Sequence, residues 1–179
     1  MGVTLQRRIL VFGIGVVLIG AIAASLWNRS PQPTESRPEV GYLAPDFAVV
    51  DLDSGKTIHL SELRGQPVLL NFWATWCPPC RQEMPDLDRI AKDFAGKAHV
   101  LAVGADPQET AETFRNFRQS LGLSLPVGVD SSGEAARLYG ARAIPTSFFI
   151  DARGVIRSTR LGAMTYDMMR EGLQAAGRS

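Results

Sequence analysis

The feature that most constrains the fold is an apolar run that ends just before two closely spaced cysteines. Residues 68–73, Val-Leu-Leu-Asn-Phe-Trp, are almost continuously apolar, which is typical of a central strand buried on both faces of a sheet. After Cys77 and Cys80, apolar residues recur at helical spacing at Met84, Leu87, Ile90, Ala91 and Phe94. The pair is therefore predicted to lie between a buried strand and a helix, with Cys77 at the helix N-terminus.

The remaining predicted elements alternate between strands and helices and end on a hairpin and a helix. We expect further strands at residues 47–50, 57–60, 99–104, 125–129, 146–150 and 155–160, and further helices at 132–139 and 166–176. Asp106-Pro107-Gln108-Glu109 has the composition of a helix start, with Asp as the N-cap and Glu at the capping-box position. The order predicts an α/β fold: a central mixed β-sheet flanked by helices, with an N-terminal β-hairpin.

The predicted place of the cysteines favours redox chemistry. Free backbone N–H groups and the positive end of the helix dipole stabilise a thiolate at Cys77, and the thiolate is the nucleophile in disulfide exchange. With only Pro78 and Pro79 between them, Cys77 and Cys80 can close to a disulfide by expelling a substrate thiol. A purely structural disulfide is an alternative, but so short a loop would gain little stability. A second alternative is a Cu(I) site formed by the two cysteines and Met84. No histidine lies near the pair in sequence, so we expect no metal.

The N-terminal segment has the properties of a membrane anchor. Residues 9–27 carry no charge and would span roughly 28 Å as a helix, which is close to the hydrocarbon thickness of a bilayer. Arg7 and Arg8 precede this run, so the positive-inside rule keeps residues 1–8 in the cytoplasm. Residues 28–39 are rich in proline and polar residues and are predicted to be a linker to a folded domain at 40–177.

We therefore expect a signal-anchor: a single N-terminal transmembrane helix in the cell (inner) membrane, with the domain on the extracytoplasmic, periplasmic side. A cleaved signal peptide is the alternative, because Ala21-Ile22-Ala23 has the form of a cleavage site. The domain is exported in both cases. The formal net charge is only +1 and no basic run is present in the domain, so nothing favours nucleic acid as a partner.

Several separate motifs resemble the thioredoxin superfamily. They are Phe72-Trp73-Ala74-Thr75-Trp76-Cys77-Pro78-Pro79-Cys80, Pro85 in the following helix, and Ile144-Pro145-Thr146 ahead of a strand. Within the superfamily, residues 41–47 (GYLAPDF), 60–65 (LSELRG) and 70–73 (LNFW) resemble the TlpA/ResA-like branch. The resemblance covers residues 40–176. It implies a thioredoxin-like fold and a bacterial, usually membrane-anchored thiol–disulfide oxidoreductase.

The resemblance also implies roles for individual residues. Cys77 is expected to attack and Cys80 to resolve, and Pro145 to be a cis proline against the disulfide, where the backbone beside it pairs with substrate. The residues expected to contact substrate are Trp76, Pro78, Pro79, Ile144 and Pro145. Glu83 matches an acidic residue near the active site of the branch. Thioredoxin has a buried Asp where this chain has Asn71, and Asn cannot exchange a proton. Glu83 is therefore the carboxylate expected to take the proton of Cys80. The alternative is that Glu83 is only a solvated charge on the helix surface.

The function implied by this resemblance is the reduction of disulfides in exported proteins. No cofactor is expected. The expected partners are proteins with cysteine pairs, such as the apocytochrome c on which several members of the branch act, and a membrane thiol reductase as electron donor. Two alternatives share the fold. A peroxiredoxin-like peroxidase would have Pro and Thr or Ser at the positions of Leu70 and Ala74, and a copper-binding chaperone would have a histidine near Pro145.

Overall fold

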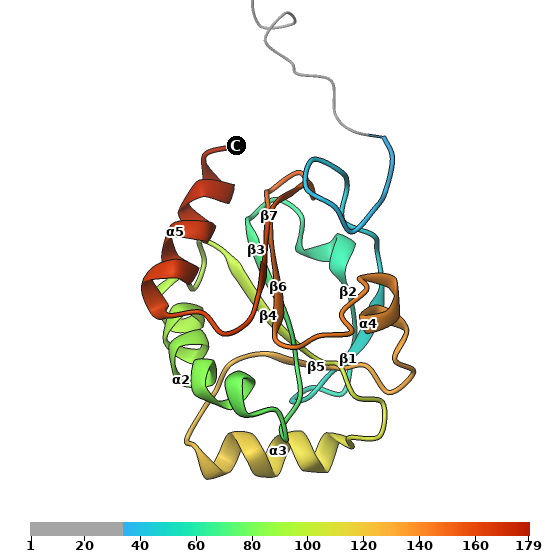
Figure 1. Ribbon diagram of the computed structural model, residues 1–179, viewed down its shortest axis with the longest axis vertical. Helices are drawn as coiled ribbons and strands as arrows, with labels where there is room; N and C mark the ends of the chain where they lie inside the picture. The colour runs from blue at the N-terminus through green and yellow to red at the C-terminus, as the bar shows by residue number, and fades with distance from the viewer. Residues whose placement is uncertain (1–33) are drawn as a thin grey trace, which may run out of the picture. The chain divides into compact units, whose positions relative to one another are not determined.

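The central feature of the computed structural model, which describes residues 34–179, is a mixed sheet of seven strands in the order β2-β1-β5-β4-β3-β6-β7 (Figure 1). Strand β3 lies parallel to β4 and antiparallel to β6, and β4 lies parallel to β5. The remaining neighbours are antiparallel. The strands are β1 (Ala48–Asp51), β2 (Thr57–His59), β3 (Val68–Trp73), β4 (His99–Gly104), β5 (Val127–Val129), β6 (Thr146–Ile150) and β7 (Ile156–Leu161).

Alternate side chains of β3 point to opposite faces of the sheet, and all of them are buried. Both faces of the sheet are therefore covered by helices. Leu69 and Trp73 belong to a core that includes residues of α2 (Pro78–Asp93), α3 (Ala111–Ser120) and α5 (Tyr166–Gly177). Leu70 and Phe72 belong to a second core with residues of α4 (Glu134–Leu138) and the 3₁₀ helix η1 (Leu60–Leu63). Figure 1 shows α2 and α5 on one side of the sheet and α4 on the other. The predicted mixed sheet, flanking helices and first hairpin are confirmed.

The expected helix start at Asp106 is wrong. The backbone turns at residues 107–109, and α3 begins only at Ala111, where the Thr110 side chain is the N-cap and accepts from the N–H of Thr113. Asp106 accepts instead from the backbone N–H of Gln108 and from a tryptophan of the preceding segment. Side-chain oxygens that serve a cap serve a turn equally well, so the local pattern was ambiguous.

The expected transmembrane segment at 9–27, residues 1–8 and the first part of the linker lie outside the described residues. Within residues 34–179, no helix has the length and apolar character needed to cross a bilayer. Of the linker residues that are described, Glu35 and Arg37 exchange backbone hydrogen bonds with Leu43, which itself bridges to Val155. These residues are thus attached to the edge of the sheet next to β7.

Candidate active site

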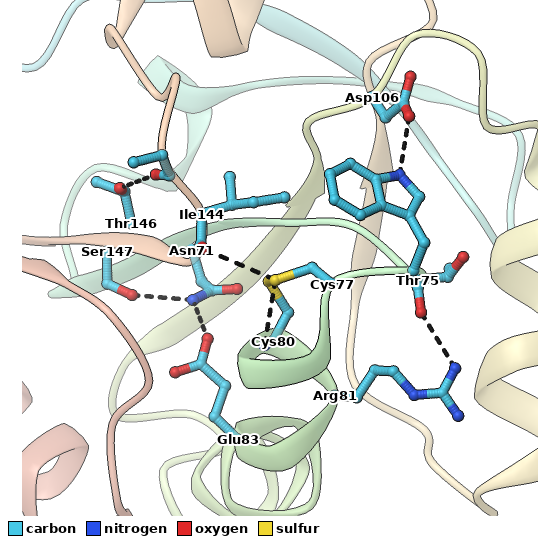
Figure 2. Close-up of a disulfide and its surroundings, with 12 residues drawn as sticks. Asn71, Thr75, Cys77, Cys80, Arg81, Glu83, Asp106, Ile144, Thr146 and Ser147 are labelled. Carbon is cyan, nitrogen blue, oxygen red and sulfur yellow. Dashed lines mark hydrogen bonds between the residues drawn. A yellow bond between two sulfur atoms is a disulfide. The ribbon is translucent and has the colours of Figure 1, made fainter.

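The Cys77–Cys80 pair is closed to a disulfide at the N-terminus of α2 (Figure 2). Cys77 is the N-cap residue, and Pro78 and Pro79 occupy the first two helical positions. Since neither proline has an N–H, the backbone N–H of Cys80 is the helix donor that reaches the Cys77 sulfur, at 3.3 Å. The Cys77 side chain is 3% exposed and Cys80 is fully buried, so Cys77 is the sulfur nearer to solvent.

The loop before β6 covers the disulfide from the other side. The Ile144–Pro145 peptide bond is cis, as the resemblance implied. The carbonyl oxygen of Ile144 lies 3.7 Å from the Cys77 sulfur, so in the dithiol form it can accept a hydrogen bond from the Cys77 thiol. Ile144 is partly buried between the two cores. The structure therefore brings residues 144–145 together with the cysteines, although 67 positions separate Ile144 from Cys77.

Glu83 lies on the buried side of α2, one turn after Cys80. Its side chain is 1% exposed, so the alternative of a solvated charge on the helix surface is wrong. One carboxylate oxygen accepts from the Asn71 amide at 2.8 Å, and the other accepts from the backbone N–H of Met164 at 2.8 Å. The Asn71 amide also donates to the Ser147 hydroxyl, and Figure 2 draws it between the disulfide and the carboxylate.

Burial dominates the protonation of Glu83. Removal of the carboxylate from water raises its pKa to about 7, and the hydrogen bonds from Met164 and Asn71 lower it by less. A carboxyl group that titrates near neutral pH exchanges a proton readily there. The Asn71 Oδ1 atom is buried without a hydrogen-bond partner, so this network has one free acceptor beside the cysteines.

The other expected substrate-contacting residues lie on the outer rim. Trp76, Pro78 and Pro79 are exposed, and the Trp76 side chain is 61% exposed although it is a large apolar group. Trp76, Pro78, Arg81, Gln82 and Leu121 line an open hollow beside the disulfide. An exposed aromatic ring next to a reactive sulfur is suited to contact a partner protein.

Sequence reasoning missed the contacts that hold the segment before Cys77. The buried carboxylate of Glu109 accepts from the backbone N–H and the hydroxyl of Thr75. Asp106 accepts from the Trp76 indole N–H at 2.9 Å. Ser147 and Met164, the partners of the Asn71–Glu83 pair, were missed as well. The burial of Glu83 could have been predicted from the sequence, because Glu83 falls on the same helical stripe as Cys80, Met84 and Leu87.

Comparisons with known proteins agree with this geometry. Residues 40–159 match the model of the AhpC/TSA family. The chain is 38% identical to the thioredoxin-like protein YneN of Bacillus subtilis, over 89% of this chain and 94% of that protein. It is 35% identical to the thiol-disulfide oxidoreductase ResA of Bacillus thuringiensis, over 95% of this chain and 98% of that protein.

A solved structure extends the likeness to three dimensions. The crystal structure of a putative thiol:disulfide interchange protein DsbE from Chlorobium tepidum superposes with a TM-score of 0.68 at 33% sequence identity. The match covers 77% of this chain and 97% of that chain. The mixed sheet and helices described above are thus arranged as in a thioredoxin-like fold.

Proposed function

The chain belongs to the thioredoxin-like AhpC/TSA family and is a thiol–disulfide oxidoreductase of the ResA and DsbE type, and from this premise we propose that it is a membrane-anchored reductant of exported proteins. Its substrates are disulfides formed by cysteine pairs, such as those of apocytochrome c. The observation that carries the proposal is the redox pair at the N-terminus of α2, where two prolines precede the one backbone donor to the Cys77 sulfur.

The proposed reaction begins with both cysteines reduced. The Cys77 thiolate attacks one sulfur of the substrate disulfide, and the other substrate sulfur leaves as a thiolate. This gives a mixed disulfide between Cys77 and the substrate. The cis Pro145 loop and the exposed ring of Trp76 flank Cys77, and we assign them, with Ile144, Pro78 and Pro79, to substrate contact.

Glu83 acts in the second half of the reaction. The buried Cys80 thiol must lose its proton before its sulfur attacks Cys77 and releases the second substrate thiolate. Cys80 and Glu83 are three residues apart on the buried side of one helix, and a carboxyl group with a pKa of about 7 is suited to take that proton at neutral pH. The enzyme is left as the Cys77–Cys80 disulfide, and two electrons have passed to the substrate.

The proline pair supports a reducing direction. A residue with an N–H at position 78 or 79 would add a donor toward the Cys77 sulfur, whereas proline adds none. A less stabilised thiolate has a higher pKa, and weaker stabilisation of the dithiol form makes the protein a stronger reductant. Each turnover consumes two electrons, so a membrane thiol reductase is the electron donor that this proposal requires.

The location rests on the uncharged run at residues 9–27 and the arginines before it. We propose that this run stays in the membrane as a signal-anchor and holds the domain on the periplasmic side. Alkaline carbonate washing of membranes from cells that express the full chain tests the anchor. Retention in the membrane fraction supports it, whereas release of the protein, or a mature N-terminus at Ala24, contradicts it.

Trapping tests the substrate. Cys80→Ser removes the resolving sulfur, so the mixed disulfide at Cys77 should accumulate. The matched control is Cys77→Ser, which retains only the fully buried Cys80 and should trap nothing. Recovery of exported proteins with cysteine pairs from the Cys80→Ser strain, and not from the control, supports the proposal. Absence of any mixed disulfide contradicts it.

A further inference from the structure

A loop after β4 binds the chain segment that leads into the active-site cysteine. We infer that Glu109 in this loop is a positioning residue for disulfide exchange: by holding Thr75 it fixes the approach of the backbone to Cys77. The inference rests on exchange at Cys77 and is independent of which protein is the substrate or where the domain is located.

Glu109 is a buried carboxylate outside the Asn71–Glu83 network. Its side chain is 8% exposed, and a carboxylate in that position needs hydrogen-bond donors. Thr75 supplies them, with its backbone N–H at 3.1 Å from Oε2 and its hydroxyl directed at Oε1. Two donors of one residue thus converge on one carboxyl group, so Thr75 is held at two points.

The segment that Glu109 holds has little other backbone support. Between the end of β3 and the start of α2, the Cys77 N–H reaches the Ala74 carbonyl at 3.3 Å. The Thr75 carbonyl accepts only from the exposed side chain of Arg81, at 3.2 Å. Within residues 34–179, Glu109 is therefore the one residue distant in sequence that accepts hydrogen bonds from Thr75, two residues before the reactive sulfur.

Asp106 makes a second contact from the same loop. Its carboxylate accepts from the indole N–H of Trp76, which is how an otherwise exposed ring keeps one orientation beside the hollow next to Cys77. The loop itself is anchored, because the Ala105 N–H donates to the Trp73 carbonyl at 2.7 Å and continues the pairing of β3 with β4. The two carboxylates thus have separable effects: Glu109 on the sulfur, Asp106 on the substrate-facing ring.

The test uses the full chain in its dithiol form with two readouts. The first is the rate at which iodoacetamide, a reagent too small to need the Trp76 surface, alkylates Cys77 across a pH range. The second is kcat and KM for reduction of a synthetic peptide closed by a C-x-x-C disulfide, with dithiothreitol as the reductant that returns the enzyme to the dithiol form. The variants are Glu109→Ala, Glu109→Gln and Asp106→Ala. Glu112→Ala is the matched control, because Glu112 is an exposed glutamate three residues further on.

Glu109→Ala should lower kcat for the peptide about tenfold and shift the pH profile of alkylation, because small misplacements of a reacting group cost one to two orders of magnitude in rate. Glu109→Gln should restore most of the rate, since its Oε1 still accepts from the Thr75 N–H. Asp106→Ala should raise KM for the peptide and leave the alkylation rate unchanged. The control should match the wild type in both readouts.

Two results would overturn the inference. Glu109→Ala kinetics equal to those of Glu112→Ala would mean that the contact with Thr75 does not affect the sulfur. A Gln variant as slow as the Ala variant would mean that the buried charge acts, and not the hydrogen bonds. If Glu109→Ala fails to fold, Thr75→Val decides the matter, because it removes one donor and keeps the side-chain shape. A wild-type rate and pH profile for Thr75→Val would then overturn the inference.

Discussion

Replacement of Glu83 by Gln should change how the stability of the oxidised protein depends on pH. Gln fits the site because Asn71 has a free acceptor in its buried Oδ1. A rotated Asn71 amide can accept from the new Gln N–H₂ and from the Ser147 hydroxyl, while the Gln oxygen accepts from the Met164 N–H. The substitution therefore removes an ionisable group and keeps the Met164 contact, while the Asn71 N–H₂ takes the buried position that Oδ1 held without a partner, a cost that does not depend on pH.

The size of the effect follows from the pKa of Glu83. Burial raises this pKa from 4.5 to about 7 in the folded protein, so folding favours the protonated carboxyl group. The associated stability is fully present below pH 4.5 and is lost as the pH rises through about 7. At 1.36 kcal/mol per pH unit, the wild type should lose about 3 kcal/mol relative to the Gln variant over that range.

Urea unfolding of the two oxidised proteins at pH 4 and pH 8.5 measures this difference, because the disulfide keeps both thiols out of the titration. The free energy of unfolding of Glu83→Gln minus that of the wild type should be about 3 kcal/mol larger at pH 8.5 than at pH 4. A difference that stays the same at both pH values would show that folding does not raise the pKa of Glu83. The proton transfer from Cys80 proposed above would then lose its physical basis.

Three further predictions concern the cysteines and the packing of the sheet. The wild-type redox potential, titrated against glutathione, should lie nearer about −270 mV than about −120 mV, and a value above about −180 mV would refute the proline argument. Pro79→His restores an N–H near the Cys77 sulfur, so it should raise the potential above the wild-type value. Iodoacetamide at limiting concentration should label Cys77 before Cys80, since only Cys77 lies at the helix end, and the opposite order would reverse their roles. Gly104→Ala should lower the free energy of unfolding in urea by about 1–3 kcal/mol, because the new Cβ would meet the Phe114 ring. Gly177→Ala is the control: Gly177 has room for a methyl group, so this variant should not be destabilised. Equal effects of the two substitutions would contradict the packing.

Much of the fold could be predicted because its signals are local. The run at residues 68–73 became β3 with the expected bounds, and the strands at 99–104 and 146–150 did as well. Cys77 is the N-cap of α2 with both prolines at its start. Apolar runs, helical spacing and a proline pair act over a few residues, so the chain near them needs little information from elsewhere.

The short polar elements were less predictable. Asp106 and Glu109 read as a helix start, yet α3 is capped by Thr110. A carboxylate satisfies a helix N-terminus and a distant N–H with similar energy, so its partner depends on which donors the packed chain brings near. Thr75 is that donor for Glu109 because the pairing of β4 with β3 places the loop beside the turn before Cys77.

The amino-acid sequence by itself determined the redox pair, the strand before it and the helix after it, because each follows from the order of residues within one turn or strand. Only the tertiary structure decided the environment of that pair. Glu83 meets the Met164 N–H across 81 positions, and the Ile144 carbonyl meets Cys77 across 67. Burial, the cause of the raised pKa of Glu83, depends on atoms contributed by β3, α2 and the loop before α5 together. A desolvated site of this kind has no signature in any one segment, since no segment excludes water from it alone.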